Sequence, residues 1–257
     1  MLLTIDIGNT NITIGLYQGQ ELGPRWRLAT DHERMPDEFG LQFVGLLAQK
    51  GFSPDDLDGI CLASVVPPLT GKILEACRQY LKLEPLVITS QVASEIRILY
   101  EPPDAVGADR IVDAIAVRRL YGGPACVVDF GTATTFDAIT AEGDYLGGAI
   151  APGVGIAAQA LFSRTAQLPR VDIQRPPSAI GRNTVHAMQS GLLFGYVGLV
   201  EGMVERFRQE LGSDMKVIAT GGLAELIARE TAVVDIIAPW LTLDGLRLVW
   251  EMNQSRK

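Results

Sequence analysis

Two stretches of the sequence decide the fold: residues 2–11, LLTIDIGNTN, and residues 125–134, ACVVDFGTAT. Each is an apolar run that ends in Asp, an apolar residue and Gly, followed by short hydroxyl or amide side chains. A second apolar run follows each stretch, at residues 12–17 and 136–140, and a turn rich in Gly and polar residues comes after it. The pattern predicts the same strand, turn and strand unit twice, which indicates an internal duplication.

Helical and strand-like patterns alternate between and after these two units, as an α/β fold requires. Apolar spacing predicts helices over residues 39–50, 69–81 and 109–121, and strands over residues 59–66 and 86–89. The breaker Gly122-Gly123-Pro124 then interrupts the pattern. We therefore expect two domains, residues 1–118 and 119–257.

The composition excludes several classes of protein. A net charge of -8 and the lack of any Lys and Arg cluster argue against a nucleic-acid partner. The cysteines Cys61, Cys77 and Cys126 have no metal-binding spacing and suit a reducing compartment. The N-terminus has no signal-peptide pattern, and the apolar run at 191–200 is too short to span a bilayer. We expect a cytoplasmic protein without a membrane segment.

Asp6 and Asp129 are the first candidates for chemistry, because each ends a predicted buried strand and precedes a glycine. Glycine lets the backbone approach a phosphate, and short polar side chains donate to its oxygens. The carboxylate can hold Mg²⁺ directly or through water. One such motif is more often a plain turn, but its repetition with matching flanks favours a polyphosphate site.

Two competing nucleotide motifs fit less well. The Walker pattern is absent, since Gly71-Lys72 lacks both the upstream Gly and the Ser or Thr that follows. Residues 153–158 match GxGxxA, and Asp172 lies at a suitable distance to bind a ribose. The segment before this match is a poor buried strand, which argues against a dinucleotide fold.

Two further segments each allow a structural and a functional interpretation. Gly107-Ala108-Asp109-Arg110 opens a predicted helix, where Asp109 is either a helix cap or a proton acceptor beside an anion-binding guanidinium. Residues 217–223 predict a strand that enters a Gly221-Gly222 turn, which is either a helix entry or a surface for a base or ribose.

These segments together resemble the type III pantothenate kinase family, within the superfamily of acetate and sugar kinases, heat-shock ATPases and actin. The resemblance runs through residues 6–11, 64–67, 107–110, 129–134, 147–153, 181–184 and 220–222 and so covers nearly the whole chain. It implies two ribonuclease-H-like (actin-like ATPase) domains, related by internal duplication and facing an ATP cleft, in a homodimer with a shared active site. The implied reaction is ATP-dependent phosphorylation of pantothenate to 4'-phosphopantothenate, the first step of coenzyme A biosynthesis, with Mg²⁺ and K⁺ or NH₄⁺.

The resemblance also implies a role for individual residues. Asp109 would be the general base, kept ionised by Arg110, Asp129 would hold the monovalent cation, and Asp6 would hold Mg²⁺. The implied ATP-binding residues are Asp6, Ile7, Gly8, Asn9, Thr10, Asn11, Ile12, Thr13, Thr132, Gly221 and Gly222. The implied pantothenate-binding residues are Tyr100, Gly107, Ala108, Asp109, Arg110 and, from the partner subunit, Thr184.

Two other functions fit the same fold: a kinase of another small acceptor, and a regulatory relative without catalysis. Tyr100 with residues 107–110 argues against the first, and the three aspartates against the second. The dimer rests on a predicted helix that either Asn183 or Thr184 can cap, in which Ala187, Gly191 and Gly195 recur every four residues. Such glycines favour close approach of another surface, either a second subunit or the C-terminal helix near residues 243–252.

Overall fold

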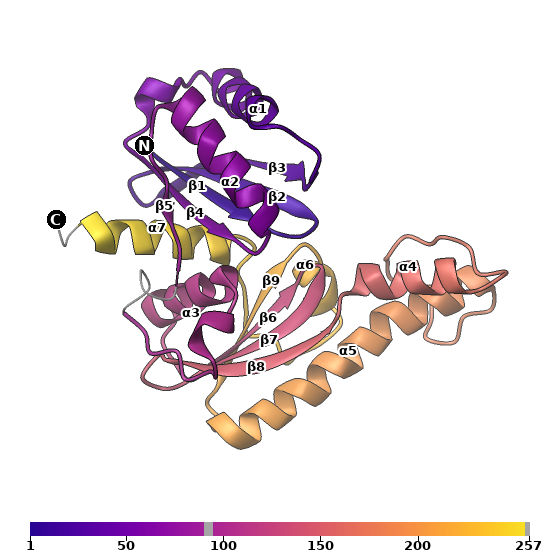
Figure 1. The fold of residues 1–257 in the computed structure, drawn as a ribbon. Helices are drawn as coiled ribbons and strands as arrows, with labels where there is room; N and C mark the ends of the chain where they lie inside the picture. The colour runs from indigo at the N-terminus through magenta and orange to yellow at the C-terminus, as the bar shows by residue number, and fades with distance from the viewer. Residues whose placement is uncertain (90–94, 255–257) are drawn as a thin grey trace. The chain divides into compact units, whose positions relative to one another are not determined.

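The structure, a computed structural model, describes residues 1–89 and 95–254. The chain divides into two compact units, one of Met1–Ala116 with the segment that begins at Leu241, and one of Val117–Trp240. Each unit holds a five-stranded mixed sheet, ordered β3-β2-β1-β4-β5 in the first and β8-β7-β6-β9-β10 in the second (Figure 1). The two orders correspond strand for strand, so the predicted α/β class and internal duplication are confirmed.

The first unit is built from the N-terminal strands and the helices that cover them. Its strands are β1 (Leu2–Ile7), β2 (Asn11–Gln18), β3 (Glu21–Ala29), β4 (Gly59–Ser64) and β5 (Leu86–Val87). Its helices are α1 (Pro36–Gln49), α2 (Pro67–Ala76) with the π-helical turn η2 (Cys77–Leu81), the start of α3 (Ala108–Leu120) and α7 (Leu241–Gln254). Two short 3₁₀ turns, η1 (Pro54–Asp56) and η3 (Pro103–Ala105), complete it.

The second unit repeats the sheet and carries a different set of helices. Its strands are β6 (Ala125–Phe130), β7 (Ala133–Ile139), β8 (Tyr145–Pro152), β9 (Lys216–Gly221) and β10 (Ile236–Ile237). Its helices are α4 (Val154–Arg164), α5 (Thr184–Leu211) and α6 (Ala224–Ala228). Asn183 caps α5 as predicted, since its side chain accepts a hydrogen bond from the His186 backbone N–H at 2.8 Å.

Side chains along β1 point alternately to the two faces of the sheet, and the two faces pack against different helices. Leu3, Ile5 and Ile7 join the core under α1 and α2, where Phe39 and Phe43 are also buried. Thr4 lies on the opposite face, where a methyl group added at the neighbouring Gly15 would lie 2.8 Å from a Leu243 methyl of α7. A strand that is buried on both faces needs apolar side chains on both, which explains why residues 2–7 are apolar except for Thr4 and Asp6.

The C-terminal helix α7 corrects the predicted domain boundary, because it belongs to the first unit and not to residues 119–257. The division also falls inside α3, at Ala116, two residues before the predicted one. Helix α7 packs on β1, β2 and β4, where Tyr17 donates a hydrogen bond to Asp244 at 2.7 Å. Gly59 gives room for Trp250, since a methyl group there would lie 2.1 Å from the indole ring.

The apolar run at residues 191–200 lies within helix α5, which is longer than that run. Among the described residues, this 28-residue helix is long and apolar enough to cross a membrane, by length and composition only. The core helix of a protein can have the same length and composition. In the structure α5 packs on β6 and β7, and its buried residues include Leu193, Val200 and Val204. Its buried Gln189 and Ser190 donate hydrogen bonds to the carbonyls of Asp172 and Ala179. These contacts account for the apolar face as part of the core of the second unit.

The dinucleotide interpretation of residues 153–158 is excluded by strand direction. The strand before the match, β8, pairs antiparallel with β7 and lies at the edge of its sheet. A dinucleotide fold needs a parallel strand there, followed by a crossover helix. The three cysteines are free and buried, as predicted, and burial raises the pKa of the Cys61 and Cys126 thiols.

Candidate active site

The first phosphate motif forms a tight turn at the carboxyl end of β1. Asp6 pairs with Thr13 across β2, and Ile7 pairs with Ile12, so residues 8–11 make the turn. The Gly8 N–H donates to the Asn11 carbonyl at 3.0 Å. Asn9, Thr10 and Asn11 are exposed, whereas Ile7 and Ile12 have no exposed surface. Of the predicted ATP ligands, these two isoleucines can therefore contribute through their backbone alone.

The carboxyl end of β4 lies beside this turn. Strands β1 and β4 are parallel with Ile7 opposite Ser64, and the Val65 N–H donates to the Ile7 carbonyl at 3.1 Å. The Ser64 hydroxyl accepts hydrogen bonds from the Val66 N–H at 3.1 Å and from the Thr70 hydroxyl at 2.8 Å. Ligands of open α/β sheets bind at this end of parallel strands, so the turn occupies the expected edge.

The start of α3 brings Asp109 to the same edge. A methyl group added at Gly107 would lie 2.4 Å from Asp109 Oδ1 and 3.3 Å from a Val65 methyl. The missing side chain at Gly107 therefore makes room for the carboxylate next to the β4 end. Within the first unit, Gly107 thus lies between the Asp109 carboxylate and Val65, and Val65 bonds to Ile7 in the strand that carries Asp6.

Both interpretations of Asp109 find support in its surroundings. Its Oδ1 accepts a hydrogen bond from the Arg110 N–H at 2.8 Å, as a residue in the first helical turn often does. Burial raises the pKa of the carboxyl group above its ordinary value, although the hydrogen bond from Arg110 and the Arg110 charge act in the opposite direction. Desolvation is the largest of these effects, and the prediction that Asp109 is ionised beside Arg110 at neutral pH stays a prediction.

The second phosphate motif repeats the first with one residue fewer. Asp129 pairs with Thr135, and Phe130 pairs with Thr134, so only residues 131–133 make the turn. Thr134 is therefore equivalent to Ile12, and its side chain is fully buried rather than part of the polar turn. In both units a threonine faces the motif aspartate across the hairpin, a correspondence that simple alignment of the two stretches does not show.

Two glycines lie beside Asp129, and a third lies against the turn that follows it. A methyl group at Gly221 would lie 2.3 Å from Asp129 Oδ1, and one at Gly131 would lie 3.2 Å from Oδ2. Gly221 also has a φ of 89°, in the left-handed region that favours glycine. At the end of β8, a methyl group at Gly153 would lie 2.1 Å from the Thr132 carbonyl. The backbone therefore approaches the Asp129 carboxylate closely from β9 and from the turn.

The remaining predicted residues lie at three places. Tyr100 is 37% exposed and belongs to the first unit. Gly222 follows Gly221 in the exposed turn that enters α6. Thr184 begins α5, at the end where α4 and α5 extend beyond the edge of the second sheet, so the structure does not place it at the Asp129 turn (Figure 1).

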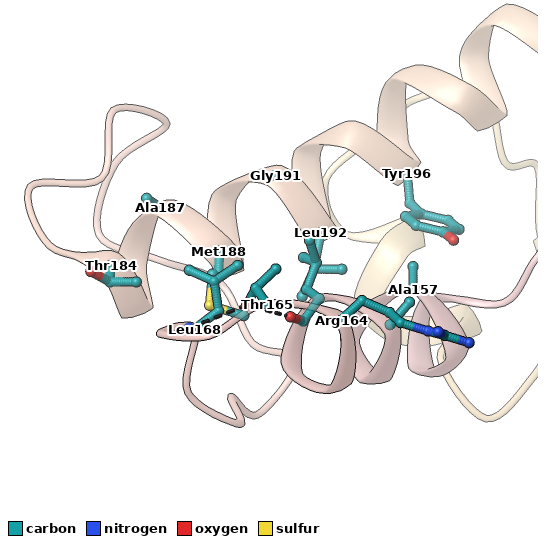
Figure 2. A pocket seen from close by; sticks show the side chains of 12 residues that line it. Ala157, Arg164, Thr165, Leu168, Thr184, Ala187, Met188, Gly191, Leu192 and Tyr196 are labelled. Atoms are coloured by element: carbon teal, nitrogen blue, oxygen red, sulfur yellow. Dashed lines mark hydrogen bonds between the residues drawn. The ribbon is translucent and has the colours of Figure 1, made fainter.

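Thr184 instead lines a groove of about 780 Å³ along α4 and α5 (Figure 2). The groove is mainly apolar, with Leu161, Met188 and Leu192 among its side chains and Arg164 at its rim. Nothing in the described chain lies within 4 Å of a methyl group added at Gly191 or Gly195. The C-terminal helix, the alternative partner for this face, packs on β1, β2 and β4.

Sequence reasoning missed one residue of the site, Thr30. Its hydroxyl donates to the Gly8 carbonyl at 2.6 Å, and its N–H donates to the Thr10 carbonyl at 2.9 Å. No local pattern marks Thr30, because it lies 22 residues from Gly8 and reaches it through pairing of β3 with β2. Among the described residues no group of three or more His, Cys, Asp or Glu side chains could hold a metal ion. A single carboxylate such as Asp6 suits Mg²⁺ carried by substrate phosphates.

Solved structures share this architecture. A structure of a putative Baf family transcriptional activator from Campylobacter jejuni matches with a TM-score of 0.62 and 22% identity, over 98% of this chain and 99% of that one. A putative 2-dehydro-3-deoxygalactonokinase from Sinorhizobium meliloti matches with a TM-score of 0.56 and 14% identity, over 98% and 96%. These likenesses show the fold alone: two α/β units, each with a five-stranded mixed sheet, form the fold class that this chain shares with those structures.

Sequence comparisons narrow this class to a family. The family model described as type III pantothenate kinase matches residues 2–206. Two proteins named type III pantothenate kinase, from Roseiflexus sp. (strain RS-1) and Moorella thermoacetica, are 52% and 53% identical to this chain. The alignments cover 99% and 98% of this chain and the whole of both relatives. The chain belongs to the type III pantothenate kinase family.

Proposed function

We propose that this chain transfers the γ-phosphoryl group of ATP to the primary hydroxyl of pantothenate and so forms 4'-phosphopantothenate for coenzyme A biosynthesis. Family membership over the full chain supports the reaction. The structural observation that carries the proposal is the partly buried Asp109 carboxylate near the carboxyl end of β4, the strand that pairs with β1 just before its turn. Phosphoryl transfer depends mainly on positioning and charge stabilisation, which rigid sheet edges provide.

The ATP site that we propose uses backbone and short side chains from both motifs. The residues of 6–13 would bind the phosphates through exposed amides and polar side chains, and Thr132 would contribute from the second turn. Gly221 and Gly222 would give a bare backbone surface to the nucleoside. Mg²⁺ would supply charge neutralisation to the phosphates, with Asp6 as its protein partner, directly or through water.

The acceptor site that we propose combines Tyr100 with residues 107–110. Arg110 would bind the pantothenate carboxylate, because a guanidinium matches a carboxylate in charge and geometry. The Oδ1 atom of Asp109 already accepts the Arg110 N–H at 2.8 Å, so we assign Oδ2 to the substrate hydroxyl. A carboxylate whose pKa is raised by burial is a stronger base than an ordinary one, which suits proton removal from an alcohol.

The first prediction is the product itself. Incubation of the purified protein with ATP, Mg²⁺, K⁺ and pantothenate should yield ADP and 4'-phosphopantothenate in equal amounts, as mass spectrometry and a coupled ADP assay can show. Acetate and hexoses in place of pantothenate should give no ADP above the acceptor-free rate. Turnover with one of these acceptors would instead support another kinase of this fold, and no turnover with any would support a regulatory protein.

The second prediction concerns the cation at Asp129. Gly221 and Gly131 let backbone approach this carboxylate, and carbonyl and carboxylate oxygens are suitable ligands for K⁺ or NH₄⁺. We expect turnover in Mg²⁺ with tetramethylammonium as the monovalent cation to fall at least about tenfold relative to K⁺. Asp129→Asn should abolish the stimulation by K⁺, whereas the exposed Asp214→Asn should keep it. Equal rates in K⁺ and tetramethylammonium would contradict the assignment.

We also propose that the enzyme is a cytoplasmic homodimer in which the partner's Thr184 enters the pantothenate site. The groove along α4 and α5 supports a partner, because its lining is mainly apolar and includes Leu161, which is 37% exposed. A second copy is the occupant that we favour, since a two-fold interface places the same groove on both subunits. Free buried cysteines fit a reducing compartment.

A further inference from the structure

The turn after β1 is held from outside by the end of β3. The Thr30 hydroxyl donates to the Gly8 carbonyl at 2.6 Å, and the Thr30 N–H donates to the Thr10 carbonyl at 2.9 Å. One residue thus fixes two carbonyls of the turn at residues 8–11, whose side chains at Asn9 and Thr10 are exposed. The turn alone does not specify this arrangement, because the bonds come from a strand 22 residues away.

These two hydrogen bonds determine where the amides of the turn point. A trans peptide is planar and holds its carbonyl oxygen and the next N–H on opposite sides. With the Gly8 carbonyl directed at Thr30, the Asn9 N–H points away from Thr30, and the same holds for the Asn11 N–H after the Thr10 carbonyl. Backbone N–H groups of a turn that point away from its support can bind an anion.

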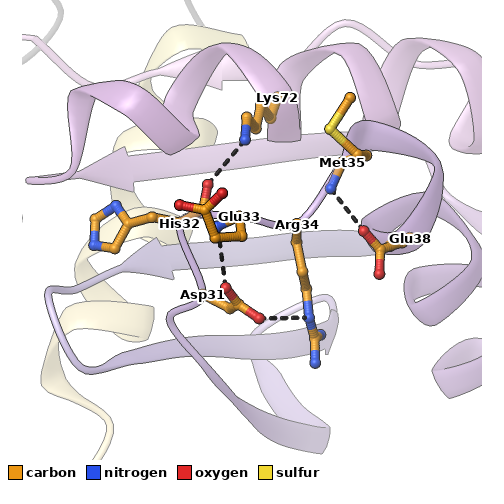
Figure 3. Close-up of polar contacts among 7 residues, drawn as sticks. All are labelled: Asp31, His32, Glu33, Arg34, Met35, Glu38 and Lys72. Carbon is orange, nitrogen blue, oxygen red and sulfur yellow. Dashed lines mark hydrogen bonds and ion pairs between the residues drawn. The ribbon is translucent and has the colours of Figure 1, made fainter.

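The segment that follows Thr30, residues 31–35, is held by hydrogen bonds within itself and to two helices (Figure 3). The Asp31 carboxylate accepts a hydrogen bond from the Glu33 N–H at 3.0 Å. Lys72 of α2 donates to the His32 carbonyl at 2.9 Å, and Glu38 of α1 accepts from the Met35 N–H at 2.8 Å. Both helices therefore fix the chain just after Thr30, so that its hydroxyl is a firm support for the turn.

The second unit has no counterpart of this support. Asn11 pairs with Ala29 in the first sheet, and Ala133 pairs with Pro152 in the second, so the position of Thr30 corresponds to Gly153. Gly153 has no side chain, and a methyl group there would lie 2.1 Å from the Thr132 carbonyl. Besides their difference in length, the two turns therefore differ in this support: the Thr30 side chain bonds to the first turn, whereas carbonyls of the second turn crowd a glycine.

We infer that Thr30 is a positioning residue for ATP, which orients the amides of the Gly8–Thr10 turn toward the phosphates without contacting the substrate itself. The inference rests on the proposed assignment of this turn to the phosphates of ATP. Its effect should fall on the nucleotide and not on pantothenate, because Thr30 bonds to the turn alone among the proposed site residues.

The test compares Thr30→Val, which keeps the shape and removes the hydroxyl, with Thr30→Ser, which keeps the hydroxyl. We expect Thr30→Val to raise the KM and the Kd for MgATP about tenfold, while the KM for pantothenate stays within about twofold. Thr30→Ser should restore both nucleotide constants. Thr4→Val is the matched control, because the Thr4 hydroxyl also donates to a glycine carbonyl of this sheet, Gly15, at 3.1 Å, but away from the turn.

Calorimetric titration with MgATP separates failure of this inference from failure of the proposed function. An unchanged Kd in Thr30→Val overturns the inference, and so does an equal rise of the KM for both substrates, which indicates general damage. If Thr30→Val does not fold, Thr30→Ala with Thr30→Ser gives the same comparison. A normal Kd in Asp6→Asn and in Thr30→Val together would instead overturn the assignment of the turn to ATP.

Discussion

Replacement of Asp109 by Asn should lower kcat by about a hundredfold or more while pantothenate still binds. The amide keeps the size of the side chain and can still accept the Arg110 N–H through its oxygen, but it cannot take a proton from the substrate hydroxyl. Steady-state kinetics with direct titration of pantothenate measures both effects. Asp104→Asn, an exposed aspartate on the same segment, is the matched control and should keep wild-type turnover.

The pH dependence follows from the direction of the Asp109 pKa. A base acts in its ionised form, so turnover falls as the pH drops through the pKa of that group. Burial raises this pKa, and the acid limb of kcat should therefore lie above the ordinary range of an aspartate. A limb at or below that range, or full activity of Asp109→Asn, would contradict the assignment of the base.

Stability should respond in the opposite direction to activity. A raised pKa means that the folded state favours the protonated carboxyl, so this contribution to stability is present at low pH and lost as the pH rises through the folded pKa. At neutral pH the neutral amide avoids the cost of a desolvated charge. Asp109→Asn should therefore unfold at the same or a higher temperature than the wild type, measured by calorimetry at pH 7.

Mixing two inactive variants should restore activity if subunits share their sites. Asp109→Asn lacks the base, and Thr184→Ala lacks the residue that we assign to the partner's pantothenate site. In a mixed dimer one site then carries both lesions and the other carries neither. With complete exchange of equal amounts, about a quarter of wild-type activity should appear, since half of the dimers are mixed and one of their two sites is intact.

The control for this experiment is a mixture of two differently tagged Asp109→Asn preparations, which should stay inactive. Co-purification through both tags establishes that subunits have exchanged. Lack of recovery in exchanged dimers, or sedimentation of the active wild type as a monomer, would remove the shared site. The groove along α4 and α5 would then need another occupant.

Much of the fold could be predicted from the sequence, because the patterns that indicate its strands, turns and helices are local. The repeated strand and turn units became β1 with β2 and β6 with β7, and the apolar spacing of residues 39–50 and 109–121 became α1 and α3. The candidate residues Asp6 and Asp129 lie at equivalent places in the two sheets, as the repeat indicated. Hydrophobic period and turn chemistry act within a few residues, so they are visible without a structure.

Features that depend on contacts between distant segments could not be predicted from the sequence. Helix α7 joined the first unit because Gly15 and Gly59 leave space for Leu243 and Trp250, which no local pattern reveals. The strand register shows that the second turn is one residue shorter than the first. The two sequence stretches do not show this difference, because they remain similar beyond the position where the register changes.

The sequence by itself therefore determined the duplicated α/β fold, the two phosphate-type turns and the family. The tertiary structure decided how these parts work as a site: that burial and not Arg110 dominates the pKa of Asp109, and that Thr30 orients the first turn. The physical reason is that desolvation and a hydrogen bond across 22 residues are properties of packed segments. Hydrophobic periodicity and residue spacing along the chain do not indicate which distant segments will pack together.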